Sequence, residues 1–83
     1  MGKHEKTLAA IFQNPIRSNI KWRNVESLFV HHGAAISEGD GSRIHVELNG
    51  AWASFHRPHP RPDTNKGAIK SVREFLNLAG ITP

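Results

Sequence analysis

Apolar residues recur at helical spacing near the start of the chain, at Leu8, Ile11 and Phe12. This i, i+3, i+4 pattern predicts a short helix over residues 3–12. The pair Asn14–Pro15 follows, and because proline disfavours helical backbone in the residue before it, the helix is expected to stop there. Residues 15–19 are then expected to form a connector, and the helix to dock on the outside of the domain or on a partner.

Two longer stretches show the same helical spacing. One runs from Trp22 to His32, with an apolar stripe of Trp22, Val25, Leu28, Phe29 and His32. The other runs from Lys66 to Ala79, with a stripe of Ile69, Val72, Leu76 and Ala79. A glycine follows each stretch, as is typical of the left-handed residue that ends many helices. Polar residues 63–65 precede the second stretch and offer N-cap side chains.

Strict alternation of apolar and polar residues marks the middle of the chain. It runs over residues 43–48, stops at Asn49–Gly50 and resumes over residues 51–56. Asn-Gly between two alternating runs predicts a type I′ hairpin with a two-residue loop. The loop sets the register. It predicts an apolar face with the pairs Leu48–Ala51, Val46–Ala53 and Ile44–Phe55, and a polar face with Glu47–Trp52, His45–Ser54 and Arg43–His56.

Residues 34–38 are a further strand candidate, so the elements predict an α+β fold. Their order is helix, helix, three antiparallel strands, helix, with the helices on one face of the sheet. We expect residues 1–83 to form one domain, with an N-terminal helix and connector over 3–19 and a core over 20–83. A chain of 83 residues has room for one modest hydrophobic core.

Charge and composition narrow the function classes. Eleven Lys and Arg against seven Asp and Glu give a formal net charge of +4, which favours a polyanionic partner such as nucleic acid. The absence of cysteine excludes disulfides, thiolate metal sites and cysteine nucleophiles. No apolar run approaches the ~20 residues of a membrane span, and residues 1–6 show no signal-peptide pattern. We therefore expect a cytoplasmic protein with no membrane partner.

Histidine is unusually frequent, with six in 83 residues. His31 and His32 fall in the last turn of a predicted helix, where an imidazolium interacts favourably with the helix dipole, so a structural role is expected for both. His4 lies in a segment expected to fray and is given no role. The pair His56 and His59 has the spacing to share a metal ion, but no carboxylate or cysteine nearby completes a ligand set. No metal or other cofactor is expected.

Acid–base chemistry is the alternative for the histidines, because imidazole exchanges protons near neutral pH. RNA cleavage needs a base for the 2′-hydroxyl, an acid for the leaving 5′-oxygen and cations that stabilise charge on phosphorus. The candidate catalytic residues are His56, His59 and His45. The candidate RNA-binding cations are Arg43, Arg57, Lys66, Lys70 and Arg73. A histidine-rich hairpin without catalytic function is the other interpretation.

Trp52 is placed by the register on the polar face beside Glu47. There it is suited to stack on a nucleic-acid base or to contact a protein partner. A purely structural role, covering the edge of the sheet, is equally compatible with the sequence.

Three segments together resemble the HicA toxins of bacterial type II toxin–antitoxin systems. They are Gly41–Ser42–Arg43, His56–Arg57–Pro58–His59–Pro60, and Lys66–Arg73 ahead of Gly80–Ile81. The resemblance covers about residues 22–81. It implies a fold like a double-stranded-RNA-binding domain, cleavage of mRNA (an mRNA interferase) and neutralisation by a HicB antitoxin.

The resemblance also ranks the candidate histidines. Many family members carry a catalytic histidine directly after the Gly-Ser pair or one residue further, where this chain has Arg43 and Ile44. His56 lies across the predicted hairpin from Arg43 and offers a replacement, and His45 projects to the same face. The family's second histidine region, in the proline-containing segment before the last helix, matches His59. The ranking is therefore His56, then His59, then His45.

Two other functions stay open on the sequence alone. A non-catalytic RNA-binding module would use the same basic face without turnover. An inactive relative of the toxins would retain only the binding of its partner. The interpretation taken forward is a small RNA endonuclease that works without a metal.

Overall fold

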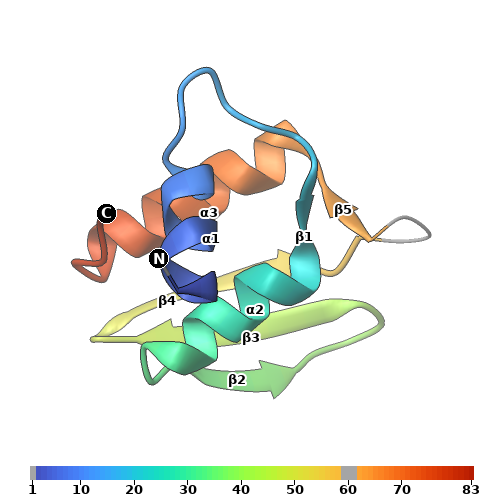
Figure 1. Cartoon of the computed structure of the whole chain (residues 1–83). Helices are drawn as coiled ribbons and strands as arrows, with labels where there is room; N and C mark the ends of the chain where they lie inside the picture. Colours follow the sequence, from blue (N-terminus) through green and yellow to red (C-terminus); the bar gives the residue numbers. More distant parts are fainter. Residues whose placement is uncertain (1, 59–61) are drawn as a thin grey trace.

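The computed structural model describes residues 2–58 and 62–83. Its elements are α1 (Lys3–Ile11), β1 (Ile20–Lys21), α2 (Trp22–His31), β2 (Ala35–Glu38), β3 (Arg43–Leu48), β4 (Ala51–His56), β5 (Asp63–Thr64) and α3 (Lys66–Leu78). Strands β2, β3 and β4 form an antiparallel sheet in that order, and β1 pairs with β5 separately (Figure 1). The predicted α+β class is confirmed, and the order α2-β2-β3-β4-α3 fits the double-stranded-RNA-binding-like arrangement.

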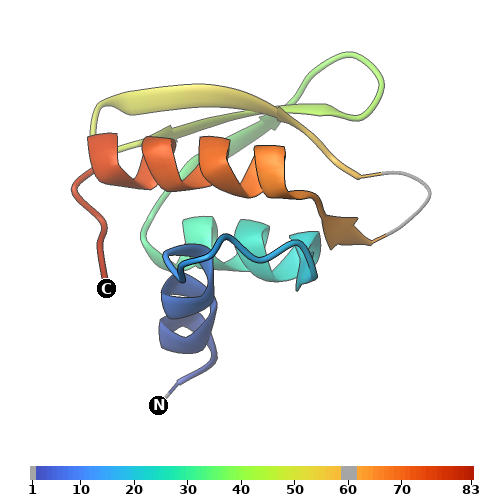
Figure 2. The same ribbon diagram turned by 90° about the horizontal axis from the view of Figure 1, so that it is seen from above.

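The three-stranded sheet has helices on one face. Helices α2 and α3 pack against this inner face, and α1 lies against the far side of the two helices (Figure 2). The outer face of the sheet carries no helix within the described residues. Because side chains alternate along a strand, every second residue of β3 and β4 points into the core and the others point outward.

The hairpin of β3 and β4 has the register predicted from its turn. Asn49 and Gly50 have φ values of 52° and 84°, as a type I′ turn requires. All six predicted cross-strand pairs are present. The side chain of Asn49 also donates to the carbonyl oxygen of Ala79 at 2.9 Å, which fastens the tip of the hairpin to the end of α3.

On the outer face of the β3–β4 hairpin, the cross-strand pairs are of the non-hydrogen-bonded kind, in which the two Cα atoms lie closer together. Past the end of β4, the backbone N–H of Arg57 donates to the carbonyl oxygen of Ser42 at 2.9 Å. Hydrogen-bonded and non-hydrogen-bonded pairs alternate along an antiparallel ladder, so the neighbouring pair Arg43–His56 is non-hydrogen-bonded. Such pairs bring their Cα atoms to about 4.5 Å and their side chains closer together.

The core is centred on phenylalanines from three different elements. The rings of Phe29 (α2), Phe55 (β4) and Phe75 (α3) lie 5.5 to 5.8 Å apart between centroids. Trp22 joins them at 5.8 Å from Phe55. The predicted apolar stripes of both long helices are buried, except that His32 is half-buried. These contacts hold α2 and α3 against the inner face of the hairpin.

Helix α1 contributes to this core; of the two docking places expected for it, the outside of the domain or a partner, it takes the outside of the domain, against α2 and α3. Leu8 and Ile11 are buried in the same cluster as the other helices. Arg73 of α3 holds the C-terminal end of α1 by donating to the carbonyl oxygens of Ile11 at 2.8 Å and Gln13 at 2.9 Å. Its guanidinium also lies 5.6 Å from the centre of the Phe12 ring. Arg73 thus supplies a cap for carbonyls that the helix itself leaves without partners.

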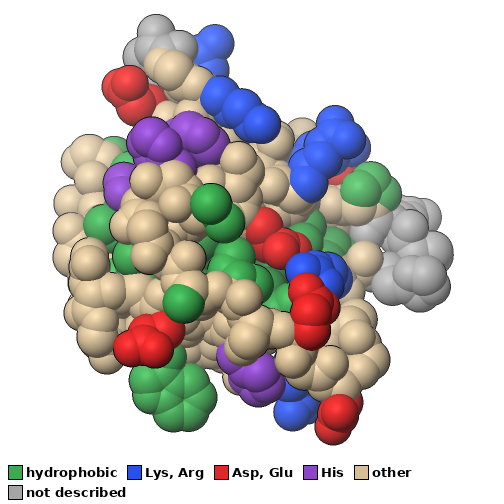
Figure 3. Space-filling model, turned by 90° about the horizontal axis from the view of Figure 1, so that it is seen from below, with side chains coloured by type: hydrophobic (Ala, Val, Ile, Leu, Met, Phe, Trp, Pro, Cys, Tyr) green, Lys and Arg blue, Asp and Glu red, His purple; other side chains and the backbone are tan. Residues whose placement is uncertain are grey.

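His4 packs against α2, contrary to the expectation of a frayed segment. Its ring stacks on His31 with 4.2 Å between centroids and 16° between planes, and His32 meets His31 edge-on at 5.2 Å. Histidine side chains are visible at two separate places on the face shown in Figure 3. Desolvation lowers the pKa of His4, and the neighbouring His31 lowers it further. The neutral ring is therefore the form that this contact favours.

The two-stranded sheet has no counterpart in the sequence-based predictions. Its register pairs Ile20 with Thr64 and Lys21 with Asp63, and the last pair forms a salt bridge of 2.9 Å. The backbone N–H of Trp22 donates to the carbonyl oxygen of Pro62 at 3.0 Å, just where α2 begins. A strand of two residues is too short to show an alternation of apolar and polar residues, so the sequence pattern could not predict β1 or β5.

We expect Arg73→Ala to lower the free energy of unfolding by about 1–2 kcal/mol, since hydrogen bonds from a charged donor contribute on this scale. Urea denaturation followed by circular dichroism measures the change. Lys70→Ala removes an exposed cation one turn earlier on the same helix and is the matched control, with an expected change within about 0.5 kcal/mol. Equal losses in the two variants would contradict a capping role for Arg73.

Candidate nucleic-acid interface

Three of the predicted site residues lie together on the outer face of the hairpin. Arg43 and His56 form the cross-strand pair at the open end, and both are exposed. His45 is the next outward residue along β3 and is half-buried. Two imidazoles and a guanidinium are thus presented to solvent on the face that no described helix covers.

The His45 ring is held in place from two sides. Its Nδ1 lies 2.7 Å from the Ser54 hydroxyl oxygen, across the hairpin. Its Nε2 faces Gly39, where an added Cβ would come within 2.9 Å of that nitrogen. Gly39 therefore leaves the space that the imidazole occupies. Neither Ser54 nor Gly39 was predicted to matter for the site.

His59 lies outside the described residues. The acid–base pair predicted from the sequence, His56 with His59, is therefore described at His56 only. His56 ends β4, directly before Arg57, so the position of its backbone depends on what holds the end of this strand.

Arg57 faces the opposite side of the sheet from His56 and binds two carboxylates. Its Nη1 and Nη2 donate to the oxygens of Glu38 at 2.7 and 2.8 Å. Its Nε and Nη2 donate to Glu26 at 2.8 and 3.1 Å. Glu26 also accepts a hydrogen bond from the Trp22 indole N–H. The structure thus gives Arg57 a bridging role among α2, β2 and β4, in place of the free phosphate ligand expected from the sequence.

The charges of this bridge reinforce one another. Hydrogen bonds from Arg57 lower the pKa of the Glu38 carboxyl, against the opposing effect of desolvation. Hydrogen bonds to Glu26 and then Glu38 raise the pKa of Arg57, so the guanidinium stays charged. Oppositely charged side chains are in contact near the middle of the face in Figure 3. Two carboxylates offset one cation here, which leaves Arg57 poorly suited to attract a phosphate.

Glu26 and Glu38 were missed by the sequence analysis, although one signal pointed to them. Arg57 lies two residues after Phe55, and side chains two residues apart on a strand point to the same face of the sheet. The predicted register therefore directs the side chain of Arg57 inward. An inward-facing arginine needs carboxylate or carbonyl partners, because a buried charge is costly when it is unpaired.

The three candidate RNA-binding cations of α3 also divide into one that is used inside the fold and two that are exposed. Arg73 donates to the carbonyls of α1, whereas Lys66 and Lys70 are exposed and have no ion-pair partner within the described residues. Asn65 caps the helix by accepting from the N–H of Ala68 at 2.8 Å, as the polar run 63–65 predicted. The start of α3, the end of β4 and the β2–β3 turn lie at the same end of the molecule (Figure 2). Lys66 therefore lies at the end that also carries Arg43 and His56.

Metal ligands are not grouped in the part of the chain that the structure describes: no three His, Asp or Glu side chains there are placed to hold an ion. The stacked rings of His4 and His31 are nearly parallel, so their nitrogens do not converge on one point. Over residues 2–58 and 62–83, no helix has both the length and the apolar character needed to cross a membrane.

Comparison with known proteins identifies the class. A family model described as "HicA toxin of bacterial toxin-antitoxin" matches residues 22–81, from the start of α2 to just beyond α3. Neither the curated proteins nor the solved structures give a match. A small α+β protein with this match is the toxin of a bacterial toxin–antitoxin pair, a class that acts with a cognate antitoxin. The chain belongs to the HicA toxin family, and α1 and β1 lie outside the matched region.

We expect acid to remove the stabilisation that Glu38 receives from Arg57. The folded-state pKa of Glu38 lies below its unfolded value near 4.5, so the stabilisation is complete above that pH and is lost as the pH falls through the folded value. Urea midpoints of the parent should therefore drop more steeply below pH 4.5 than those of Glu38→Gln. Glu74→Gln, an exposed change on α3, should follow the parent. Parallel profiles for the parent and Glu38→Gln would disprove the coupling.

Proposed function

We propose that this toxin is a metal-independent RNA endonuclease, an mRNA interferase that a HicB-like antitoxin neutralises. Membership of the family supports a toxin with a cognate antitoxin. The proposal adds the reaction, the substrate and the type of antitoxin. The observation that carries it is the grouping of Arg43, His45 and His56 on the uncovered face of the sheet.

The chemistry needs only side chains. One imidazole removes the proton of a ribose 2′-hydroxyl, and the 2′-oxygen attacks the adjacent phosphorus. A second group protonates the departing 5′-oxygen, which leaves a 2′,3′-cyclic phosphate on one fragment and a 5′-hydroxyl on the other. His56 is the first candidate for one of these roles, because it is exposed beside a guanidinium. His59, from the sequence alone, and His45 are the candidates for the other.

Arg43 is placed to stabilise the reacting phosphate. It is the cross-strand neighbour of His56 in a closely spaced pair, so a phosphate that reaches the imidazole also reaches the guanidinium. A fixed cation stabilises the additional negative charge that develops on the phosphoryl oxygens. Lys66 and Lys70 are exposed on α3, whose start lies at the same end of the molecule, and they are the candidates to bind neighbouring phosphates of the same strand.

The same outer face suits a protein inhibitor. Trp52 is 73% exposed on it, and tryptophan and arginine are the residues that most often dominate binding energy in interfaces. An antitoxin that covers Trp52 and Arg43 would also cover His56, and inhibition would follow from exclusion of RNA. Action on mRNA implies a cytoplasmic site of activity.

The salt dependence of RNA binding tests the assignment of cations. Three of the predicted RNA-binding cations, Arg43, Lys66 and Lys70, have no ion-pair partner within the described residues, and they imply a log–log salt slope of about −2 on single-stranded RNA, at about −0.7 for each contact. Titration of 2′-O-methyl RNA, which lacks the attacking hydroxyl, measures it without cleavage. Lys70→Ala should make the slope shallower by about 0.7. Lys6→Ala, the same loss of charge on α1, should leave it unchanged, and a slope near zero in the parent would rule out the cationic surface.

Substitution of the histidines tests the catalytic proposal. Expression of the parent should arrest bacterial growth, and His56→Ala should relieve the arrest, since loss of a general acid or base lowers the rate by roughly a hundred- to ten-thousandfold. His59→Ala should act similarly and His45→Ala more weakly. His4→Ala, a histidine outside the site, is the matched control and should stay toxic.

Circular dichroism of each variant separates lost chemistry from lost structure. An exposed residue at a strand end contributes little packing, so His56→Ala should change stability by less than about 0.5 kcal/mol. If both His56→Ala and His59→Ala stay folded and fully toxic, the catalytic role passes to His45. Cleavage at the parent rate by all three purified variants would refute histidine catalysis and favour the non-catalytic RNA-binding module.

A further inference from the structure

We propose that the groove on the outer face of the sheet binds one unpaired base of the RNA, stacked on Trp52, and that Glu47 makes guanine the preferred base. The inference rests on the proposed function, because it names the part of the substrate that this face would recognise. It concerns residues nearer the hairpin turn than Arg43 and His56.

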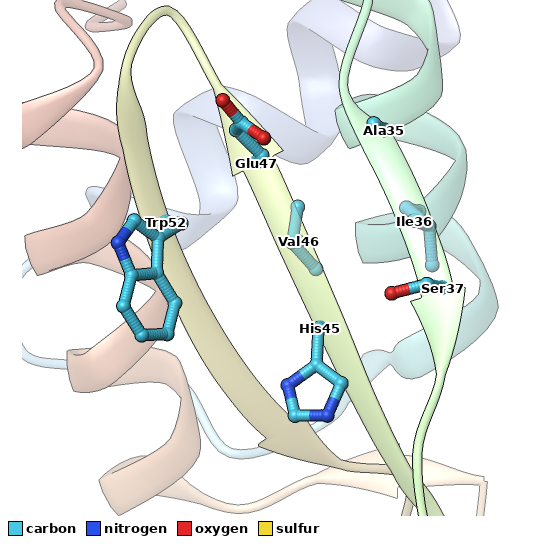
Figure 4. A pocket seen from close by; sticks show the side chains of 7 residues that line it. All are labelled: Ala35, Ile36, Ser37, His45, Val46, Glu47 and Trp52. Atoms are coloured by element: carbon cyan, nitrogen blue, oxygen red, sulfur yellow. The ribbon is translucent and has the colours of Figure 1, made fainter.

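The groove has a shape suited to a flat ring. Its β2 side is formed by the small residues Ala35 and Ser37, and larger side chains rise from the other strands. Trp52 on β4 and His45 on β3 both project from the viewed face of the sheet (Figure 4). Small residues along the β2 side and larger side chains on β3 and β4 leave a shallow space that a planar base can enter.

Trp52 is exposed in a way that the fold does not require. It is 73% exposed, whereas the other tryptophan, Trp22, is only 5% exposed and belongs to the core. The other large apolar side chains with high exposure, Val30 and Leu78, lie on helices. Stacking of a base on an exposed indole removes apolar surface of both partners from water, and every base has a face that can do so. Trp52 therefore supplies affinity without selecting a base.

Selection comes from Glu47, the cross-strand partner of Trp52. The two residues form a non-hydrogen-bonded pair, which places their Cα atoms about 4.5 Å apart. Within the described residues, the carboxylate of Glu47 has neither a hydrogen bond nor an ion pair, and the residue is exposed. A carboxylate offers two acceptor oxygens and matches two adjacent donors best. Guanine presents such a pair, N1–H and the 2-amino group, whereas adenine and cytosine present one donor next to an acceptor and uracil one donor between acceptors.

The distribution of charge along the face favours a nucleotide over an acidic protein. Glu47 lies near the turn, and Arg43 lies four residues away on the same strand, a separation of about 13 Å at about 3.3 Å per residue. An acidic partner laid along the face would meet repulsion from Glu47. A nucleotide strand instead has neutral, hydrogen-bonding bases and anionic phosphates, so its base fits the end with Glu47 and its backbone the end with Arg43. The guanine would be read close to the reacting phosphate but not at it.

Fluorescence of the intact protein tests the stacking. The probes are short 2′-O-methyl oligouridines with one central guanosine, adenosine or cytidine, which bind without being cleaved. We expect the guanosine probe to quench the emission of Trp52. Trp52→Phe should abolish the quenching while the buried Trp22 still emits. Trp52→Leu should weaken binding of the guanosine probe by about five- to hundredfold, as measured by fluorescence anisotropy of end-labelled probes.

Substitution of the carboxylate tests the selection. Glu47→Gln keeps the size of the side chain but leaves one acceptor, so the guanosine probe should lose its advantage over the adenosine probe. Glu74→Gln removes a carboxylate from the exposed surface of α3 and should keep the advantage. Equal affinities for all probes in the parent would overturn the choice of guanine. So would an advantage that survives Glu47→Gln.

Two results would overturn the stacking itself. One is the absence of quenching by any probe. The other is a Trp52→Leu variant that binds RNA as the parent does but no longer binds the antitoxin, which would make this surface a protein interface. Neither bears on cleavage: a parent that cuts RNA through its histidines while the groove fails keeps the endonuclease proposal. Guanosine-dependent quenching in a protein that cuts nothing would support the groove and refute the chemistry.

Discussion

The type I′ turn at Asn49–Gly50 determines which side chains of the sheet face solvent and which enter the core. Side chains alternate along β3 and β4, so a slip of one residue in their pairing would bury His45 and Glu47 and expose Ile44. Burial of the apolar set is worth about 1.5–3 kcal/mol for each large side chain, which makes such a slip prohibitive. The stability of the core and the composition of the outer face are therefore set by the same two-residue turn.

The alternation also explains how His56 and Arg57 serve different purposes although they are neighbours in sequence. His56 points outward, and Arg57 points inward to Glu26 and Glu38. The arginine joins the strand end to α2 and β2, so the backbone that carries His56 is fixed from the opposite side of the sheet. The positive charge of the chain suggested that Arg57 binds RNA, but in the structure its guanidinium binds carboxylates that fix the end of β4. The positive surface available to a polyanion is correspondingly smaller than the net charge implies.

Much of this fold could be predicted because its signals are local. The apolar stripes of α2 and α3 repeat within a few residues, and the alternation of apolar and polar residues on both sides of Asn-Gly predicts the hairpin. The contacts that were not predicted join distant segments without any period: β1 with β5, Arg73 with Ile11, and His4 with His31. The grouping of Arg43 with His56 followed from register alone. To predict the partners of Arg57, the inward direction of its side chain would have had to be combined with the packing of α2 and β2. No single segment of the sequence reveals that packing.

The cap that Arg73 places on α1 has a consequence for synthesis of the protein. A nine-residue helix is marginal in water by itself, and the carbonyls at the end of this one are satisfied by a side chain 62 residues later. On the ribosome, α1 and the α2 helix on which it packs emerge well before α3, so the carbonyls of the last turn of α1 lack this cap until residue 73 has left the exit tunnel. The cap therefore joins the early and late parts of the chain only after the last helix has been made.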